Sequence, residues 1–491
     1  MARWTVAIGA VAGASACSGA GPQLVVVVDT DAPVIGALAA DAGLGKRSLA
    51  GAVDWVRIDV LEDDGGTGQE YEFPLPDEGD WPVSFGVSGA GGGPSSGVAH
   101  LRVRAFGAAF ATPGELRGLP TRDPIPEVAI DRLVDIPFPS RGVERRRILL
   151  AADCMGRPAS FEGSSTTCID GASLRASASD GVAADDGAPS HVGQWAAARP
   201  VDCPVPKVAA DAGRVCIRGG VSILGDVGLL GDSNGSTILE SAPLVPVVLT
   251  PFWLDETEVT VATYRGLLAG GLAKGGAPRP FDPDASADAS ARYCTWTASA
   301  GPHEDLPVNC VDLVSARAVC RALGGDLPTE AQWEHAARGR GRQDTYPWGN
   351  DPPLTLAGGP ACDRASYARA SLSGSPPECG SGSDPTVEPV RSHPADRSPD
   401  GVFDLAGGVS EIVLDAPRSY SDPCWGGPGL RRDPSCVDPT ATAAGSGVLR
   451  GGSFLEPSFF LQLAVRQSEG APSSLPSPAV GFRCAYPAVA P

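Results

Sequence analysis

The sequence of 491 residues predicts a β-rich, multi-domain protein, with an N-terminal antiparallel β-sandwich and a C-terminal domain of α+β type. Its length, at roughly 100–200 residues per domain, is enough for about two to four domains. Its 63 Gly and 47 Pro residues favour short strands and many turns over helical bundles. Apolar and polar residues alternate in the first third of the chain, whereas helical spacing appears only later and in short segments.

Residues 17–170 are predicted to form the sandwich, of immunoglobulin-like type. The strand-like runs in it are Leu24–Val28, Val56–Val60, Val83–Val87, Leu101–Arg104, Val128–Phe138 and Arg145–Ala152. Residues 171–213 are rich in Ala, Ser, Asp, Gly and Pro, show little periodicity, and are predicted to be a linker.

Two short helices are predicted beyond the linker. Thr329 and Gln332 have the spacing of a capping box, with Trp333, Ala336 and Ala337 on one face and Gly339 at the end. An earlier apolar stripe consists of Ala316, Val319, Cys320 and Leu323, and it ends at Gly324 and Gly325. Trp333 and Trp348 are expected to pack in the core.

Residues 1–16 are predicted to be a signal peptide, because a basic Arg3 precedes an apolar stretch too short to span a bilayer. The stretch ends at Ala14-Ser15-Ala16-Cys17, which resembles the lipobox of bacterial lipoproteins. This resemblance implies a lipid on Cys17 and a place in the bacterial cell envelope, and Ser18 favours the outer membrane. The alternative is ordinary signal cleavage beside an incidental cysteine.

The charge balance excludes two classes of partner. Asp and Glu number 58 against 38 Lys and Arg, which leaves a net charge of −20. Phosphate backbones and anionic lipid surfaces would be repelled, so neither nucleic acid nor a membrane surface is an expected partner; membrane contact is expected through the lipid anchor alone.

The cysteine content is typical of an oxidising compartment, since the chain has 13 Cys but only two Met. Without Cys17, twelve remain, an even number that can pair completely. Proximity favours Cys154–Cys168, Cys203–Cys216, Cys294–Cys310, Cys362–Cys379 and Cys424–Cys436, which leaves Cys320 and Cys484. The sequence alone leaves the connectivity open. No CxxC spacing occurs, so a zinc site is not expected.

Several motifs in the second half of the chain occur in one order and spacing. They are VCIRGG at 215–220, ETEVTVATY at 256–264, LPTEAQWE at 327–334, AARG at 336–339, PWGN at 347–350, FDLAGGVSE at 403–411, RGGSF at 450–454 and GFRC at 481–484. Together they resemble the formylglycine-generating enzyme, or sulfatase-modifying factor, family. The FDLAGGVSE segment is a weakened version of that family's DMxGNVWEW. The resemblance covers residues 214–487 and implies a variant of the C-type lectin fold.

The resemblance also implies a chemistry whose reactive groups this chain lacks. Enzymes of the family oxidise a cysteine in a CxPxR target to formylglycine, using two thiols after the GGS segment that hold Cu(I). Here Glu456 stands where the first thiol is expected, and no cysteine follows until Cys484. A carboxylate does not replace thiolate at Cu(I), so copper and catalysis are not expected. The resemblance further implies a structural disulfide between Cys484 and Cys320.

Two other metals have weaker signals. The family's enzymes bind calcium in the GNVWEW loop, which implies a weak site at Glu411 and Asp404, although Gly408 replaces the Asn. The alternative is that Glu411 is a solvated loop carboxylate. The related ergothioneine-type sulfoxide synthases bind iron through histidines. Here no two histidines have HxxxH spacing, so iron is not expected, and His335 is expected at the surface or as a cap; the histidines are His100, His191, His303, His335 and His393.

The function predicted from the sequence is a non-catalytic, formylglycine-generating-enzyme-like module that binds a protein, peptide or glycan, on an exported lipoprotein. One alternative is an oxidase that uses another thiol, such as Cys424 or Cys436. The other is a structural protein of the envelope.

Overall fold

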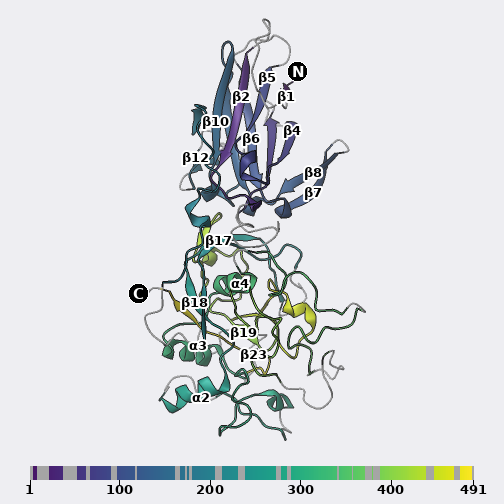
Figure 1. Cartoon of the computed structure of the whole chain (residues 1–491), viewed down its shortest axis with the longest axis vertical. Coiled ribbons are helices and arrows are strands. Elements are labelled where there is room, and N and C mark those ends of the chain that lie inside the picture. The colour runs from purple at the N-terminus through teal and green to yellow at the C-terminus, as the bar shows by residue number, and fades with distance from the viewer. Residues whose placement is uncertain are drawn as a thin grey trace. The chain divides into compact units, whose positions relative to one another are not determined.

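A computed structural model describes the chain in two compact units, Met1–Arg199 with Pro428–Leu430 and Pro200–Gly427 with Arg431–Pro491 (Figure 1). The described residues are 4–7, 22–36, 52–61, 67–89, 97–116, 119–160, 166–171, 174–175, 180–204, 213–229, 238–271, 278–284, 289–339, 342–355, 358–370, 379, 387–437, 447–468 and 476–488. Within these ranges, no helix has both the length and the apolar character needed to cross a membrane.

The first unit is built from two larger sheets. One has the order β1 (Trp4–Ala7), β5 (Val83–Gly89), β2 (Gln23–Thr30), β10 (Val143–Leu150), β13 (Val182–Ala184). The other has the order β4 (Thr67–Pro74), β3 (Trp55–Leu61), β6 (Val98–Phe106), β9 (Ile130–Pro137). Two-stranded pairs are formed by β7 (Ala111–Leu116) with β8 (Leu119–Pro124) and by β11 (Thr167–Cys168) with β12 (Leu174–Arg175). Every run that the sequence predicted as a strand overlaps one strand of the two larger sheets.

The prediction of a purely antiparallel first unit is wrong at one pairing, because β10 runs parallel to β2 along their whole length. In β2, Leu24, Val26 and Val28 are fully buried, and Val27 is 2% exposed. A strand that is apolar on both faces is typical of a central position in a sheet that is covered on both sides. The continuous apolar run therefore indicated the strand but not the direction of its neighbour.

The predicted linker is also too long at its N-terminal end. Strand β13 lies within it and pairs antiparallel with β10. Trp195 is 3% exposed, and its Nε1 donates a hydrogen bond to Asp153. His191 contacts the buried carboxylate of Asp29. Polar contacts and one buried aromatic side chain hold this segment on the first unit. Neither kind of contact produces the hydrophobic periodicity from which strands and helices are predicted.

The second unit combines three small sheets with three helices. The sheets have the orders β14 (Arg214–Ile217), β18 (Phe252–Asp255), β24 (Ala485–Pro487); β15 (Gly220–Leu224), β17 (Val245–Leu249), β20 (Arg431–Arg432); and β16 (Ile238–Leu239), β22 (Arg466–Ser468), β21 (Val448–Arg450), β19 (Ser410–Ile412), β23 (Val480–Gly481). The helices are α2 (Val261–Ala269), α3 (Leu313–Ala322) and α4 (Glu330–Arg338). Figure 1 shows α2, α3 and α4 among these short strands and many loops.

Helix α4 begins and ends where the sequence predicted. The hydroxyl of Thr329 accepts a hydrogen bond from the backbone N–H of Gln332, and the Gln332 side chain accepts one from the backbone N–H of Thr329, which completes the capping box. Trp333 is fully buried. Gly339 ends the helix with φ of 65°, and a Cβ there would lie 2.7 Å from Pro399, so a larger residue does not fit.

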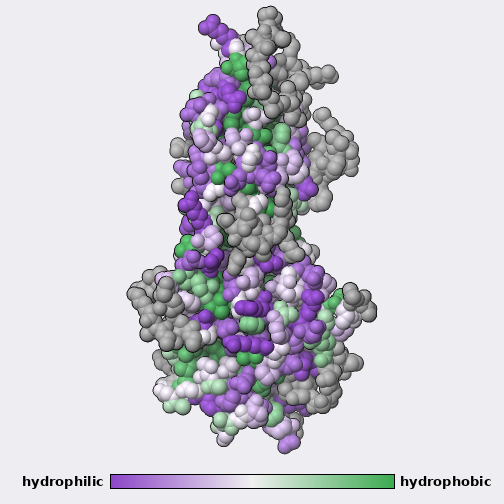
Figure 2. Space-filling model, viewed as in Figure 1, coloured by the Kyte–Doolittle hydropathy of each residue, from purple (hydrophilic) through white to green (hydrophobic). Residues whose placement is uncertain are grey.

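Hydrophilic residues cover much of the face seen in Figure 2, with small hydrophobic patches between them. Among the described residues, the large apolar side chains that remain exposed are separated along the chain, namely Val143, Val201, Val227, Val314, Leu354 and Phe459. Scattered exposed side chains of this kind are ordinary on a protein surface.

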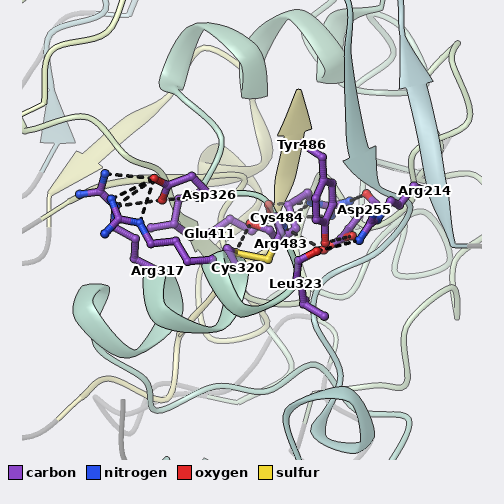
Figure 3. The surroundings of a disulfide bond; sticks show 12 residues. Arg214, Asp255, Arg317, Cys320, Leu323, Asp326, Glu411, Arg483, Cys484 and Tyr486 are labelled. Atoms are coloured by element: carbon purple, nitrogen blue, oxygen red, sulfur yellow. Dashed lines mark hydrogen bonds and ion pairs between the residues drawn. A yellow bond between two sulfur atoms is a disulfide. The ribbon is translucent and has the colours of Figure 1, made fainter. Parts of the chain in front are cut away.

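The structure contains six disulfides, at the pairings that proximity and the leftover pair predicted. They are Cys154–Cys168, Cys203–Cys216, Cys294–Cys310, Cys320–Cys484, Cys362–Cys379 and Cys424–Cys436. The Cys320–Cys484 bridge joins α3 to the residue before β24 (Figure 3). It spans 164 residues, and the chain-entropy model gives such a bridge about 5 kcal/mol of stabilisation.

We predict that replacing both Cys320 and Cys484 by Ala lowers the free energy of unfolding more than replacing both Cys203 and Cys216. The second bridge spans only 13 residues, so its loss releases less chain entropy, by about 2 kcal/mol. Urea denaturation of both double variants measures the difference. Equal losses would contradict the entropic argument.

Candidate functional site

The candidate site is centred on Glu456, which lies between β21 and the short 3-10 helix Ser458–Leu461. Its Oε2 accepts hydrogen bonds from the hydroxyls of Ser410, at 2.9 Å, and Ser453, at 3.0 Å. Its Oε1 accepts a hydrogen bond from the side-chain amide of Gln467. Ser410 begins β19 and Gln467 lies on β22, so the sheet that also contains β21 positions these two donors.

The three donors are buried and uncharged, while the carboxylate itself is half-buried. Ser410 is 1% exposed, Ser453 is fully buried and Gln467 is 5% exposed. Among the residues that the structure describes, no cationic side chain lies within ion-pair distance of the Glu456 carboxylate, and its hydrogen-bond partners are the three neutral donors. The site is thus a carboxylate oriented by neutral groups rather than a salt bridge.

No free thiol accompanies Glu456. Every cysteine of the second unit forms a disulfide, including Cys424 and Cys436, which the oxidase alternative required as thiols. Because Cu(I) is held by soft thiolate ligands, the side chains present do not fit copper. Cys17 lies outside the described residues.

Glu411 is not a solvated loop carboxylate, so that interpretation is wrong, and protein donors already occupy its oxygens. It is 1% exposed, and the Nε and Nη2 of Arg483 donate to its two oxygens at 2.7 and 2.6 Å. The Nε1 of Trp333 donates to the same carboxylate at 2.9 Å. With both oxygens committed to donors, Glu411 is the buried counter-ion of Arg483.

Asp404 is also tied to protein groups. Its Oδ2 accepts a hydrogen bond from the backbone N–H of Arg391 at 2.7 Å, and burial raises the pKa of its carboxyl. A Cβ at Gly408 would lie 2.4 Å from the Glu258 carboxylate, so glycine is needed here. Among the residues described, no three acidic, histidine or cysteine side chains are grouped so as to hold a metal ion. The donor set does not fit the calcium site that the resemblance implied.

The prediction that His335 lies at the surface is wrong. The ring is 2% exposed, its Nε2 donates to the carbonyl of Arg218 at 2.9 Å, and burial lowers its pKa. His393 differs, because both of its nitrogens face acceptors: the carbonyl of Asp363 at 3.1 Å and the carboxylate of Glu388 at 2.7 Å. Burial alone would lower the pKa of His393, but the bond to Glu388 raises it. Neither histidine has the setting of an iron ligand.

The sequence analysis identified Glu456 but missed the residues that hold it, above all Ser410. A signal was present: the family motif DMxGNVWEW has Trp immediately before the Glu, whereas this chain has Ser410 before Glu411. The replacements at positions 410 and 456 meet in space as a hydrogen-bonded pair. Gln467 carried no such signal, because its role depends on the register of β22 beside β21.

Trp348 lies where the sequence predicted a core anchor but is only partly buried. It stacks on Tyr346 with ring centroids 5.1 Å apart, and its Nε1 donates to the carbonyl of Asp351. Trp333, in contrast, is fully buried, as predicted.

The second unit is similar in sequence to known proteins. Residues 204–488 match the model of the sulfatase-modifying factor enzyme 1-like domain. A formylglycine-generating enzyme of Streptomyces coelicolor is 30% identical over 322 residues, which cover 58% of this chain and 96% of that protein. A Bos taurus protein named inactive C-alpha-formylglycine-generating enzyme 2 is 44% identical over 61 residues, 11% of this chain and 20% of that protein. The solved structure of PvdO from Pseudomonas aeruginosa covers 56% of this chain and 94% of its own, with 19% identity and a TM-score of 0.39.

We predict that Asp415, a buried carboxyl beside α4, makes the protein less stable as the pH rises from about 4 to 7. Burial raises its pKa to about 7, although the backbone N–H of Glu330 donates to it. An unfolded aspartate loses its proton near pH 3.9, so between these values the folded state holds a proton that the unfolded state has released. The contribution of this group to the free energy of unfolding is therefore greatest at low pH and falls by up to about 1.4 kcal/mol per pH unit.

Urea denaturation at several pH values tests this prediction. The Asp415→Asn variant should lose this part of the pH slope, while the exposed control Asp284→Asn should keep it. An unchanged slope in Asp415→Asn would show that this group is not the source.

Proposed function

Because this chain belongs to the sulfatase-modifying factor enzyme 1-like family, we propose that its C-terminal domain is a non-catalytic binding module for a protein, peptide or glycan. The observation that carries the proposal is Glu456. A carboxylate held by Ser410, Ser453 and Gln467 stands where the family resemblance implies the first copper-binding thiol.

The disulfides support the same proposal. Copper(I) chemistry of this type requires two reduced thiols, and all the cysteines of the second unit are paired. The scaffold motifs are kept, since the capping box of α4 and the Arg483–Glu411 pair are intact. A domain that retains the fold of an enzyme family but lacks the catalytic groups is better suited to ligand binding than to catalysis.

A relative gives the proposal a precedent. The bovine protein that matches over 61 residues is named an inactive formylglycine-generating enzyme, so the family includes at least one member whose name denotes lost activity. That match spans only a fifth of the relative, and it supports the plausibility of a non-catalytic member without assigning a ligand.

We further propose that the chain is exported and lipid-anchored at Cys17 in the bacterial cell envelope, with the outer membrane as its location. The signal-like residues 1–16 and the pairing of all the other cysteines support this proposal. In the mature chain of this proposal, the immunoglobulin-like first unit, without the edge strand β1 that lies within residues 1–16, would follow the anchor and precede the binding module along the sequence.

The test of the missing chemistry is an assay with a CxPxR peptide, copper and oxygen. We expect no aldehyde product from this protein, because no thiol pair holds the metal, whereas the Streptomyces coelicolor enzyme serves as the positive control. Titration of free thiols in the denatured, unreduced mature protein should give none. Turnover above a boiled control would overturn the proposal and favour the oxidase alternative.

The test of the anchor is expression of the full chain in a Gram-negative host supplied with labelled palmitate. The wild-type protein should carry the label and sediment with the membranes, and Cys17→Ala should abolish both. Cys203→Ala with Cys216→Ala is the matched control for loss of cysteine elsewhere and should retain the label. Membrane-free, unlabelled wild-type protein would favour ordinary signal cleavage.

A further inference from the structure

We propose that Glu456 binds a primary ammonium group, carried by a lysine side chain or an amino sugar. This inference rests on the proposed binding function and names the chemistry of the group bound at the site. The starting observation is that the Glu456 carboxylate is half-buried and is held by neutral donors alone. The three neutral donors orient the carboxylate but carry no opposite charge, and a cationic ligand would supply one.

The hydrogen bonds leave one acceptor position on the carboxylate. An ionised carboxylate has about four lone-pair sites, two on each oxygen. Oε2 accepts from both Ser410 and Ser453, so its capacity is filled. Oε1 accepts from Gln467 only. The site therefore has capacity for a single further donor, on Oε1.

One remaining acceptor distinguishes between the cations that proteins and ligands offer. A guanidinium binds a carboxylate best through two parallel hydrogen bonds, which require both oxygens, and here Oε2 is already occupied by two serines. An ammonium is a compact charge that needs only one good acceptor. A metal ion would need several ligands, and none of the acidic, histidine and cysteine side chains in the described ranges form such a group.

An exposed aromatic side chain follows Glu456 closely in the sequence. Phe459, three residues beyond Glu456, is 40% exposed and packs edge-to-face on Phe460 with centroids 5.3 Å apart. An exposed aromatic ring attracts a cation through its face and packs against the methylene groups of a lysine stem. The net charge of −20 would also favour the approach of a cationic partner at low ionic strength.

The test uses three fluorescein-labelled, end-blocked peptides of Gly and Ser that differ at one central residue: lysine, acetyl-lysine or arginine. Fluorescence anisotropy is measured up to millimolar protein. The lysine peptide should bind, the acetyl-lysine peptide should not, and the arginine peptide should bind more weakly. A glucosamine trimer used as a competitor distinguishes the two sources of the ammonium. If the trimer displaces the lysine peptide at a concentration below the Kd of that peptide, the ammonium is assigned to an amino sugar.

Two variants separate the charge from the fold. Glu456→Gln should weaken lysine binding about tenfold or more, because a charge-assisted hydrogen bond becomes a neutral one. Its thermal unfolding temperature identifies any loss of folded protein. Asp284→Asn removes one exposed carboxylate elsewhere in the same unit and should leave binding unchanged.

The outcomes also separate this inference from the proposed function. Equal binding of the lysine and acetyl-lysine peptides, or binding unaffected by Glu456→Gln, would overturn the ammonium site while leaving a binding module in place. Failure of all the peptides and of the trimer at millimolar concentration would overturn the ammonium site as well. The aldehyde and thiol assays test the absence of catalysis independently of either result.

Discussion

The arrangement of the second unit depends on the buried guanidinium of Arg483. It is fully buried and donates to the Glu411 carboxylate and to the backbone carbonyls of Asp255, Phe403 and Asp404. The next residue, Cys484, is bonded to Cys320 of α3, and its N–H donates to Asp255 (Figure 3). One short segment therefore connects β18, β19 and α3. Removing one partner of such a pair typically costs about 3–5 kcal/mol, because the other charge stays buried.

A second set of buried charges brackets the candidate site. Arg450 and Arg466, both fully buried, form ion pairs with Glu330 at the start of α4. Arg450 immediately precedes the glycines that lead to Ser453, and Arg466 immediately precedes Gln467. The chain segment that carries Glu456 is thus fixed at both ends by arginines that pair with one helix, α4. Ser410 is placed in turn by Glu411, its neighbour in β19, so both ionic anchors converge on the donors of Glu456.

The features that the sequence predicted well are those coded within a few residues. The capping box of α4 needs only Thr329 and Gln332, and five disulfides close loops of 12 to 17 residues. Glu456 was found because a motif fixed its position. The features that were missed depend on long-range packing: the parallel register of β10 on β2, the burial of His335 against the Arg218 carbonyl, and the pairing of Glu411 with Arg483. A short window of sequence holds no signal for such contacts.

The residues that stabilise the fold are separate from the residue at the candidate site, so the site can differ within the family while the fold is retained. Several motifs that carry the family resemblance hold buried charges or disulfides in this structure, where substitution is costly. Glu456 lies between two anchors, is half-buried and, among the described residues, accepts side-chain hydrogen bonds only from Ser410, Ser453 and Gln467, so the side chain at this position belongs to neither ionic network. A carboxylate also takes no part in thiol–disulfide exchange, which a reactive cysteine beside five disulfides would enter. Glu456 therefore differs from a thiol at this position in having no redox chemistry of its own.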